Sequence, residues 1–256
     1  MTMQTDMTLN KKKVLIIGGT SGIGLEVAHV FNVDHDVVII GRDIQKIAGD
    51  YLLSESIKIS CDIGDERQRQ ELLEKIKDFG VSKIIHCAGI FKTKIQDEES
   101  YEEEYRKIKL GGVDIIKKMI SEHPKEITHV CSISSLYTLL PDSFELVPKF
   151  EKQIQQELEK EMMSLEGVIS NCVAPGMTRT PLAEEAFGGE EGMKKILESV
   201  PGSRIVEPKE VADEIYKLSN QNEIDKKVIP VDGDFLKFFK LKTLKENNEL
   251  GRIKLK

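Results

Sequence analysis

Short runs of apolar residues, many of them β-branched, recur along the chain, and most contain no alternating polar residue. This pattern is typical of strands that are buried on both faces of a parallel sheet. The runs that we interpret as strands are 14–17, 37–40, 57–59, 84–86, 127–133, 168–173 and 228–231.

Helical patterns lie between these runs. Apolar residues recur at helical spacing after the first run, up to Phe31, and longer charged helices are expected at 65–78, 96–122, 149–164 and 207–218. Gly111 and Gly112 fall inside the longest helix, where glycine costs about 1 kcal/mol relative to alanine, so close packing is expected there. Residues 181–200 contain glycines and acidic residues and are interpreted as a mobile flap with short helices.

Strand and helix alternate throughout, which predicts an α/β fold with a doubly wound parallel sheet. We expect a single domain at 13–233, preceded by a flexible lead-in at 1–12 and followed by a basic tail at 234–256. Lysines and phenylalanines in the tail leave two interpretations open: contact with a membrane or acidic partner, or packing on the protein's own subunits. The second is favoured.

The segment that joins the first strand to the first helix contains Gly18, Gly22 and Gly24. Such a turn directs backbone N–H groups and the positive end of a helix dipole at one point, which suits a pyrophosphate. A glycine trio also serves plain strand–helix connections, so the spacing by itself is weak evidence.

Composition narrows the classes of function. Apolar residues make up 39 % of the chain and charged residues 32 %, and the net charge of −7 argues against nucleic-acid binding. No apolar run approaches the roughly 20 residues that cross a bilayer, and the first residues lack the apolar core of a signal peptide, so a cytoplasmic protein is expected. Cys61, Cys87, Cys131 and Cys172 form no C-x-x-C pair and are expected to be reduced and buried.

Several motifs together resemble those of the short-chain dehydrogenase/reductase family. They are the turn Gly18-x-x-x-Gly22-x-Gly24, Cys61-Asp62-Ile63, His86-Cys87-Ala88-Gly89, Ser132-Ile133-Ser134-Ser135, the run from Asn171 to Pro181, and Val231-Asp232-Gly233. The resemblance implies a Rossmann-like sheet of about seven strands with helices on both faces. It also implies hydride transfer between a nicotinamide dinucleotide and a small carbonyl or alcohol, in a homodimer or homotetramer formed through the two long helices, with no nucleic-acid or membrane partner.

The same resemblance implies a set of cofactor-binding residues. They are Gly18, Thr20, Ser21, Gly22, Ile23, Gly24, Asp62, Ile63, Ala88, Gly89, Lys152, Pro175, Gly176, Thr178 and Thr180. The choice of cofactor follows from the end of the second strand, where Gly41 stands in place of the acid that holds the ribose 2′-hydroxyl of NAD. Arg42 follows and suits a 2′-phosphate, which predicts NADP, with NAD still possible because Asp43 could reach the hydroxyl.

The family's catalytic set is a Tyr, a Lys four residues later, a Ser and an Asn. Ser135 matches the Ser and Lys152 the Lys, whereas Pro148 occupies the Tyr position and Lys109 the Asn position. Because proline has no proton to give, three hypotheses stand. Tyr137 acts as a substitute acid with charge from Lys109, or the protein is a catalytically silent NADP-binding sensor or oligomer partner, or the cleft serves another ligand.

Overall fold

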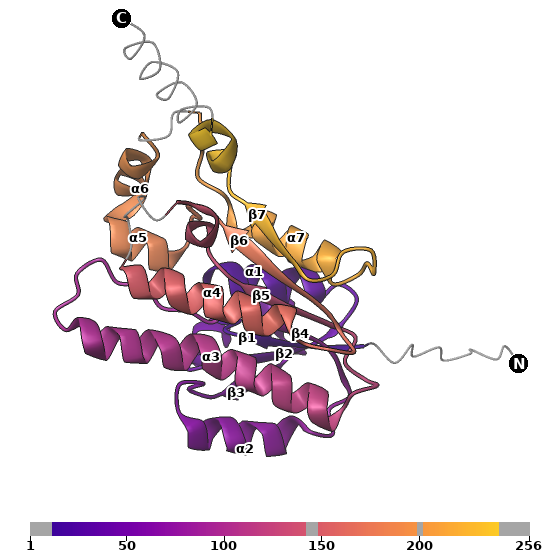
Figure 1. Cartoon of the computed structure of the whole chain (residues 1–256). Coiled ribbons are helices and arrows are strands. Elements are labelled where there is room, and N and C mark those ends of the chain that lie inside the picture. The colour runs from indigo at the N-terminus through magenta and orange to yellow at the C-terminus, as the bar shows by residue number, and fades with distance from the viewer. Residues whose placement is uncertain (1–11, 142–147, 199–201, 241–256) are drawn as a thin grey trace, which may run out of the picture.

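A computed structural model describes residues 12–141, 148–198 and 202–240. Within these ranges one parallel sheet has the strand order β3-β2-β1-β4-β5-β6-β7 (Figure 1). The strands are β1 (Lys13–Ile17), β2 (Asp36–Gly41), β3 (Ile57–Ser60), β4 (Val81–His86), β5 (His129–Ile133), β6 (Ile169–Pro175) and β7 (Lys227–Val231).

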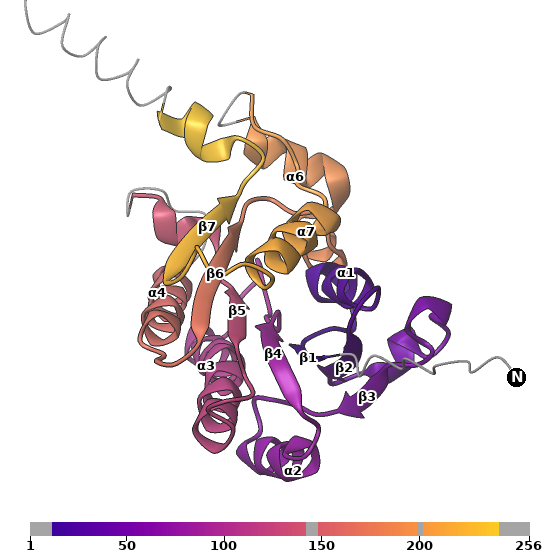
Figure 2. The same cartoon turned by 90° about the vertical axis from the view of Figure 1, so that its right-hand side faces the viewer.

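Helices cover both faces of the sheet (Figure 2). One face carries α1 (Gly22–Phe31) and α7 (Pro208–Leu218), and the other carries α2 (Glu66–Ile76), α3 (Glu98–Glu122) and α4 (Lys149–Met163). Short 3-10 turns, which the sequence did not predict, follow β2 at η1 (Ile44–Ile47) and η2 (Tyr51–Leu53) and follow β5 at η3 (Leu136–Leu139). The predicted doubly wound α/β fold is therefore confirmed.

Strand β1 shows why the apolar runs lack polar alternation. Leu15 and Ile17 belong to the core beneath α2, α3 and α4, whereas Val14 and Ile16 belong to the core beneath α1 and α7. All four side chains are fully buried. Since successive side chains of a strand point to opposite faces, a sheet covered on both faces needs an apolar residue at every position. Each such side chain contributes about 1.5–3 kcal/mol on burial.

The order of the strands creates a crevice at the middle of the sheet. The chain runs outward from β1 through β2 to β3, and in the opposite direction from β4 through β5 to β7. Ile17 pairs with Ile40 on one side and with His86 on the other, so the segments that follow β1, β2 and β4 leave the sheet at one level. A ligand-binding crevice is expected at such a reversal point.

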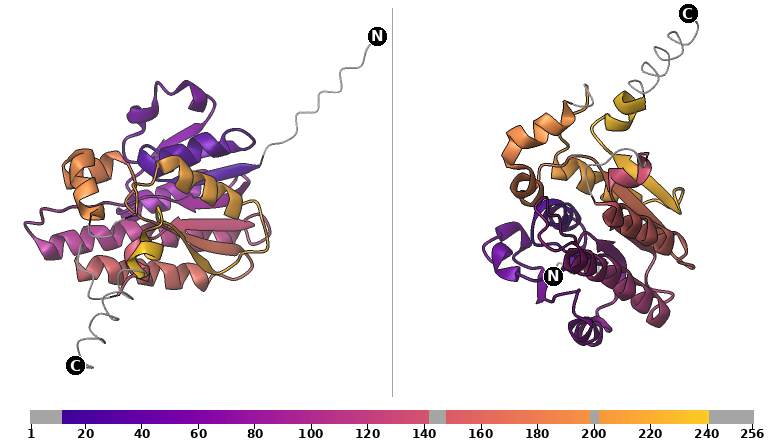
Figure 3. Two further views of the ribbon diagram at one scale, coloured as in Figure 1. Left: turned by 90° about the horizontal axis from the view of Figure 1, so that it is seen from above. Right: turned by 60° about the vertical axis from the view of Figure 1, so that its left-hand side comes forward.

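The segment predicted as a flap contains α5 (Pro181–Phe187) and α6 (Gly189–Leu197) (Figure 3, left). Met193 and Leu197 of α6 are buried. Phe235, at the start of the predicted tail, packs with Leu136 and Leu197. The predicted lead-in at 1–11, the end of the flap at 199–200 and the tail from 241 lie outside the described residues. In the ranges that the structure describes, no helix combines the length and the apolar character that crossing a membrane requires. All four cysteines are free, as expected, with Cys87 half-buried and the others buried.

Helix α3 lies unusually close to the sheet because of its two glycines. A Cβ atom at Gly111 would stand 2.4 Å from the carbonyl oxygen of Ile63, and one at Gly112 would stand 2.4 Å from the His86 ring. The close packing predicted for this glycine pair is confirmed. His86 then joins strand to helix, since its Nε2 lies 3.1 Å from the carbonyl oxygen of Lys109.

The His86 ring is buried in the neutral form. Burial, aided by the nearby charge of Lys109, lowers the pKa of His86 from 6.5 to about 3. The unfolded chain therefore binds a proton at mildly acidic pH that the folded protein does not bind, and this linkage favours unfolding as the pH falls.

We expect Gly112→Ala to lower the free energy of unfolding by about 1–3 kcal/mol, because helix and ring must move apart to admit the methyl group. Gly49→Ala is the matched control, since nothing lies within 4 Å of a Cβ atom there and its φ is not positive. That variant should keep its stability or gain about 0.4–1 kcal/mol. Guanidinium unfolding curves measure both, and equal stabilities for the two variants would contradict the packing described.

Acid stability tests the buried histidine. Between pH 6.5 and about 3, wild type should lose stability at up to roughly 1.4 kcal/mol per pH unit more than His86→Asn, which cannot titrate there. Urea unfolding at a series of pH values gives the two slopes, and comparing slopes removes any constant cost of the substitution. Parallel slopes would show that His86 is not held neutral.

Candidate active site

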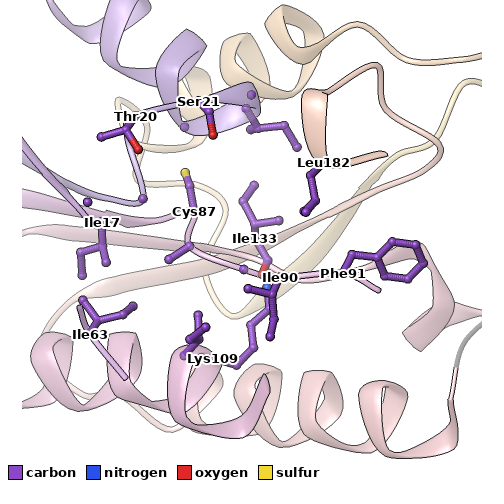
Figure 4. A pocket seen from close by; sticks show the side chains of 18 of the residues that line it. Ile17, Thr20, Ser21, Ile63, Cys87, Ile90, Phe91, Lys109, Ile133 and Leu182 are labelled. Carbon is purple, nitrogen blue, oxygen red and sulfur yellow. Dashed lines mark hydrogen bonds between the residues drawn. The ribbon is translucent and has the colours of Figure 1, made fainter. Parts of the chain in front are cut away.

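A cleft of about 500 Å³ opens at the carboxyl ends of the central strands (Figure 4). It is lined by the turn after β1, by the ends of β2, β3, β4 and β5, by α3 and α4, and by the first residues of α5. Its position is the crevice that the strand order creates. Figure 4 shows Thr20 and Ser21 on one side of the cleft and Lys109 on the opposite side.

The glycines of the turn after β1 are required by contacts. Gly18 has φ +87°, and a Cβ atom there would stand 2.5 Å from the backbone nitrogen of Ala88. A Cβ atom at Gly24 would stand 2.1 Å from the carbonyl oxygen of Gly18. Side chains at these positions would push β1, α1 and the end of β4 apart, so the tight turn from strand to helix depends on glycine.

The N-terminus of α1 suits an anion. Ser21 precedes the helix but its side chain makes no capping hydrogen bond, and the first turn carries no acidic residue. By contrast, Asp65 caps α2 and Asp97 caps α3 through their side chains. The first N–H groups of α1 therefore border the cleft without a side-chain acceptor, and they fit the pyrophosphate of a dinucleotide.

The cleft wall beyond β2 is cationic. Arg42 and Lys46 line it, and no carboxylate in the described ranges lies within ion-pair distance of Arg42. Asp43 accepts a hydrogen bond from the backbone N–H of Gln45 at 3.2 Å and thereby caps η1. A Cβ atom at Gly41 would stand 2.6 Å from the Thr20 side chain, so this position has no room for an acid.

The remaining residues predicted to bind the cofactor fall into two groups. Ile63, Ala88, Gly89 and Asp62 line the cleft, and the Oδ1 atom of Asp62 accepts a hydrogen bond from the Gly64 N–H at 2.9 Å.

The residues Pro175, Gly176 and Thr178 instead line an adjoining, mostly apolar pocket of about 200 Å³. Thr180 lines both cavities and caps α5 by accepting from the Ala183 N–H at 3.1 Å.

The three predicted catalytic residues do not meet at one point. Ser135 and Tyr137 line both the cleft and the apolar pocket, and the Ser135 Oγ accepts a hydrogen bond from the Tyr137 N–H at 3.3 Å. Burial and the charge of Glu151 raise the pKa of Tyr137 to about 12. Lys152 lines neither cavity, and its Nζ donates to the carbonyl oxygen of Leu140 at 2.7 Å. Pro148 immediately precedes α4.

The residues that α4 does present to the cleft were not predicted. They are Glu151 and Gln155, which are both 4 % exposed. Glu151 and Gln155 are four residues apart, as are the Tyr and Lys of the family. Each lies three residues after the position that the sequence match selected, Pro148 or Lys152. The sequence did contain a signal for these two residues. Each directly follows an apolar residue of the buried stripe of α4, which is formed by Phe150, Ile154, Leu158 and Met162.

Hydrogen bonds from α3 hold these two side chains. The hydroxyl of Tyr101 donates to Glu151 Oε1 at 2.9 Å, and Gln155 Nε2 donates to the hydroxyl of Tyr105 at 2.8 Å. Gln155 Oε1 is buried and has no hydrogen-bond partner among the residues that the structure describes. Burial raises the pKa of Glu151 to about 7, opposed by the Tyr101 hydrogen bond and the charge of Lys109.

Lys109 enters the cleft from α3 (Figure 4). It is 5 % exposed, and its Nζ lies 3.4 Å from the carbonyl oxygen of Ile133. Burial lowers the pKa of Lys109 to about 8. The cleft thus holds one buried acid and one buried base, with pKa values that burial has moved toward neutrality.

Comparison with known proteins agrees with this geometry. The short chain dehydrogenase family model matches residues 12–191. L-fucose dehydrogenase of Mus musculus is 30 % identical over 226 residues, which cover 82 % of each chain. Carbonyl reductase family member 4 of Xenopus laevis is 26 % identical over 241 residues, covering 87 % of this chain and 97 % of the relative. A solved short chain dehydrogenase/reductase family protein superposes with a TM-score of 0.72 and 25 % identity, covering 89 % of this chain and 98 % of the other.

The matched residues include the glycine turn, the strands that border the cleft and the helices that carry Lys109 and Glu151. The chain therefore belongs to the short chain dehydrogenase family of oxidoreductases.

Proposed function

We propose that the protein catalyses NADP(H)-dependent hydride transfer to a small carbonyl compound or from the corresponding alcohol. The observation that carries the proposal is the uncapped N-terminus of α1, which faces the cleft at the reversal point of the sheet. When bound, the nicotinamide cofactor would supply or accept the hydride. The turn from Gly18 to Gly24 would hold its pyrophosphate.

The choice of NADP rests on the wall beyond β2. Arg42 and Lys46 offer positive charge there, and Asp43 is engaged in capping η1. A guanidinium without a carboxylate partner suits the 2′-phosphate of NADP, and the space taken by Thr20 excludes the acid that would favour NAD.

The substrate site follows from the two cavities. Ser135 lies where the cleft adjoins the apolar pocket, and we infer that its hydroxyl binds the substrate oxygen. The pocket beside it is lined by side chains such as Leu136, Leu140, Met177 and Phe187, which favours substrates with an apolar substituent next to the carbonyl group.

We also propose that the protein is a homodimer or homotetramer formed through α3 and α4. Arg106 pairs with Glu157, and Lys117 pairs with Glu161, between these helices in one chain. This pairing reduces the charge that a second copy would have to cover. Light scattering of the purified protein decides between these assemblies and a monomer.

One observation favours a second candidate function, a catalytically silent NADP-binding protein. Pro148 has no proton to give, and Lys152 does not line the cleft. Such a protein would bind NADPH and reduce no carbonyl compound.

Replacing Arg42 tests the cofactor assignment. Arg42→Ala should weaken NADPH binding about 10-fold or more, through loss of a charge-assisted contact of about 1.5–3 kcal/mol, and should leave NADH binding unchanged. Fluorescence titration of the reduced dinucleotides measures both affinities, with Arg106→Ala as the charge-matched control. Equal losses for NADPH and NADH would refute the preference for NADP.

A panel of carbonyl substrates tests the reaction. Wild type should oxidise NADPH with them, and Ser135→Ala should lower kcat/KM by about 10²-fold because the substrate oxygen loses a donor. Turnover is followed by the loss of NADPH absorbance. Tight NADPH binding without turnover of any carbonyl would instead support the silent binding protein.

A further inference from the structure

We propose that Glu151 is the proton donor of this reaction and that Lys109 acts with it as an electrostatic partner. Together they would replace the Tyr and Lys that are usual in the family. The inference rests on the proposed function, because a proton donor is needed where a carbonyl oxygen is reduced. It adds Glu151 of α4, which the sequence match did not select, and pairs it with Lys109 of α3, which occupies the family's Asn position.

The direction of the hydrogen bonds at Glu151 indicates which carboxyl oxygen carries the proton. The backbone N–H of Lys92 donates to the Tyr101 hydroxyl at 3.0 Å, and that hydroxyl donates its own proton to Glu151 Oε1 at 2.9 Å. Oε1 is therefore an acceptor. Oε2 has no hydrogen-bond partner in the described part of the chain. The proton of the neutral carboxyl group thus belongs on Oε2, where a ligand in the cleft can receive it.

The ammonium group of Lys109 is buried in the same cleft. No carboxylate in the described ranges lies within ion-pair distance of it, and its Nζ donates to the carbonyl oxygen of Ile133 at 3.4 Å. A buried cation is costly unless an anion faces it. Glu151 becomes that anion when it gives up its proton, so Lys109 stabilises the product state of the proton transfer.

The groups that face Glu151 come from two neighbouring elements. Tyr101, Tyr105 and Lys109 lie on α3, and Tyr137 lies in η3. Lys109 is the cation among them. The pKa of Glu151, which burial raises to about 7, suits donation near neutral pH, whereas the pKa of Tyr137 is raised to about 12.

The residue one turn further along α4 completes the site. Gln155 lines the cleft, and its Nε2 donates to the Tyr105 hydroxyl. Within the described ranges its buried Oε1 has no hydrogen-bond partner. That oxygen can accept a hydrogen bond from a sugar hydroxyl of the cofactor. In the family, one lysine both binds the ribose of the cofactor and supplies a positive charge. Here the neutral amide of Gln155 would bind the ribose, and Lys109 would supply the charge.

In reduction, bound NADPH would supply a hydride to the carbonyl carbon, which would form a C–H bond, and the carbonyl oxygen would receive the proton of Glu151 Oε2 and form an O–H bond. Glu151 is left as a carboxylate facing Lys109, and the products are the alcohol and NADP⁺. Solvent protonates Glu151 before the next turnover, and oxidation of the alcohol runs through the same groups in reverse.

The first experiment needs no cofactor. Protein with ¹³C-labelled glutamate carboxyl groups should show one resonance that titrates near pH 7 and is missing in Glu151→Gln. In Lys109→Met this titration should move to higher pH, because the cation that favours the carboxylate is gone. Glu161→Gln, an ion-paired position on the same helix, is the control and should keep the resonance. Glutamates that all titrate below pH 5, or a titration unmoved by Lys109→Met, would overturn the inference.

The second experiment separates the inference from the proposed function. Glu151→Gln, which keeps the shape of the side chain, should bind NADPH within about threefold of wild type and lose about 100-fold or more in kcat. Wild-type kcat for reduction should fall above about pH 7, where Glu151 is ionised, and Tyr137→Phe should retain that profile.

Each contrary outcome has a separate meaning. If Tyr137→Phe abolishes turnover and Glu151→Gln does not, Glu151 is not the donor and the proposed function stands. If wild type binds no NADPH, the proposed function fails and the inference fails with it. A kcat loss in Glu151→Gln that Glu151→Asp partly restores, with the pH dependence retained, would support donation by the carboxyl group over a merely structural role.

Discussion

The contact of one backbone with another at the end of β1 is the constraint on which the rest of the site depends. Gly24, in the first turn of α1, lies so close to the carbonyl group of Gly18 that no side chain fits between them. This contact directs the N-terminus of α1 at the crevice between β1 and β4. Because the first N–H groups of a helix lack partners within the helix, the turn presents backbone donors that suit an anion. Strands that leave the sheet at the same level form the cleft walls around these donors.

A second feature is the placement of charge inside a low-dielectric region. His86, Lys109 and Glu151 are all buried. Burial favours the neutral form of each group, so it lowers the pKa of His86 and Lys109 and raises the pKa of Glu151. Among the described residues no acidic side chain faces His86, so it remains a neutral link between β4 and α3. The charges of Lys109 and Glu151 each favour the ionised form of the other group and so oppose the effect of burial. Both pKa values therefore lie near neutral pH. Proximity to the sheet, allowed by Gly111 and Gly112, brings Lys109 to the cleft.

Much of the fold and of the cofactor cleft could be predicted from the sequence. The apolar runs around Val14 and Val37 indicated buried parallel strands because a doubly covered sheet requires them, and the glycines after β1 indicated a phosphate turn because their conformation and contacts exclude side chains. These are local properties, so they are visible in short stretches of residues. The prediction that Arg42 meets a 2′-phosphate rested on equally local reasoning, and Arg42 does line the cleft.

The set of side chains that α4 presents to the cleft lay beyond local reasoning. Counting residues from Ser135 places Pro148 and Lys152 at the family's Tyr and Lys positions, but counting does not give the rotation of the helix, which packing sets. In the structure, Phe150, Ile154, Leu158 and Met162 turn α4 so that Glu151 and Gln155 enter the cleft and Lys152 does not. The sequence alone determined the alternation of strands and helices and the glycine turn that follows β1. Tertiary structure decided which acid and which cation share the cleft, because burial against α3 and the sheet, and not spacing along the chain, selects the face that a helix presents.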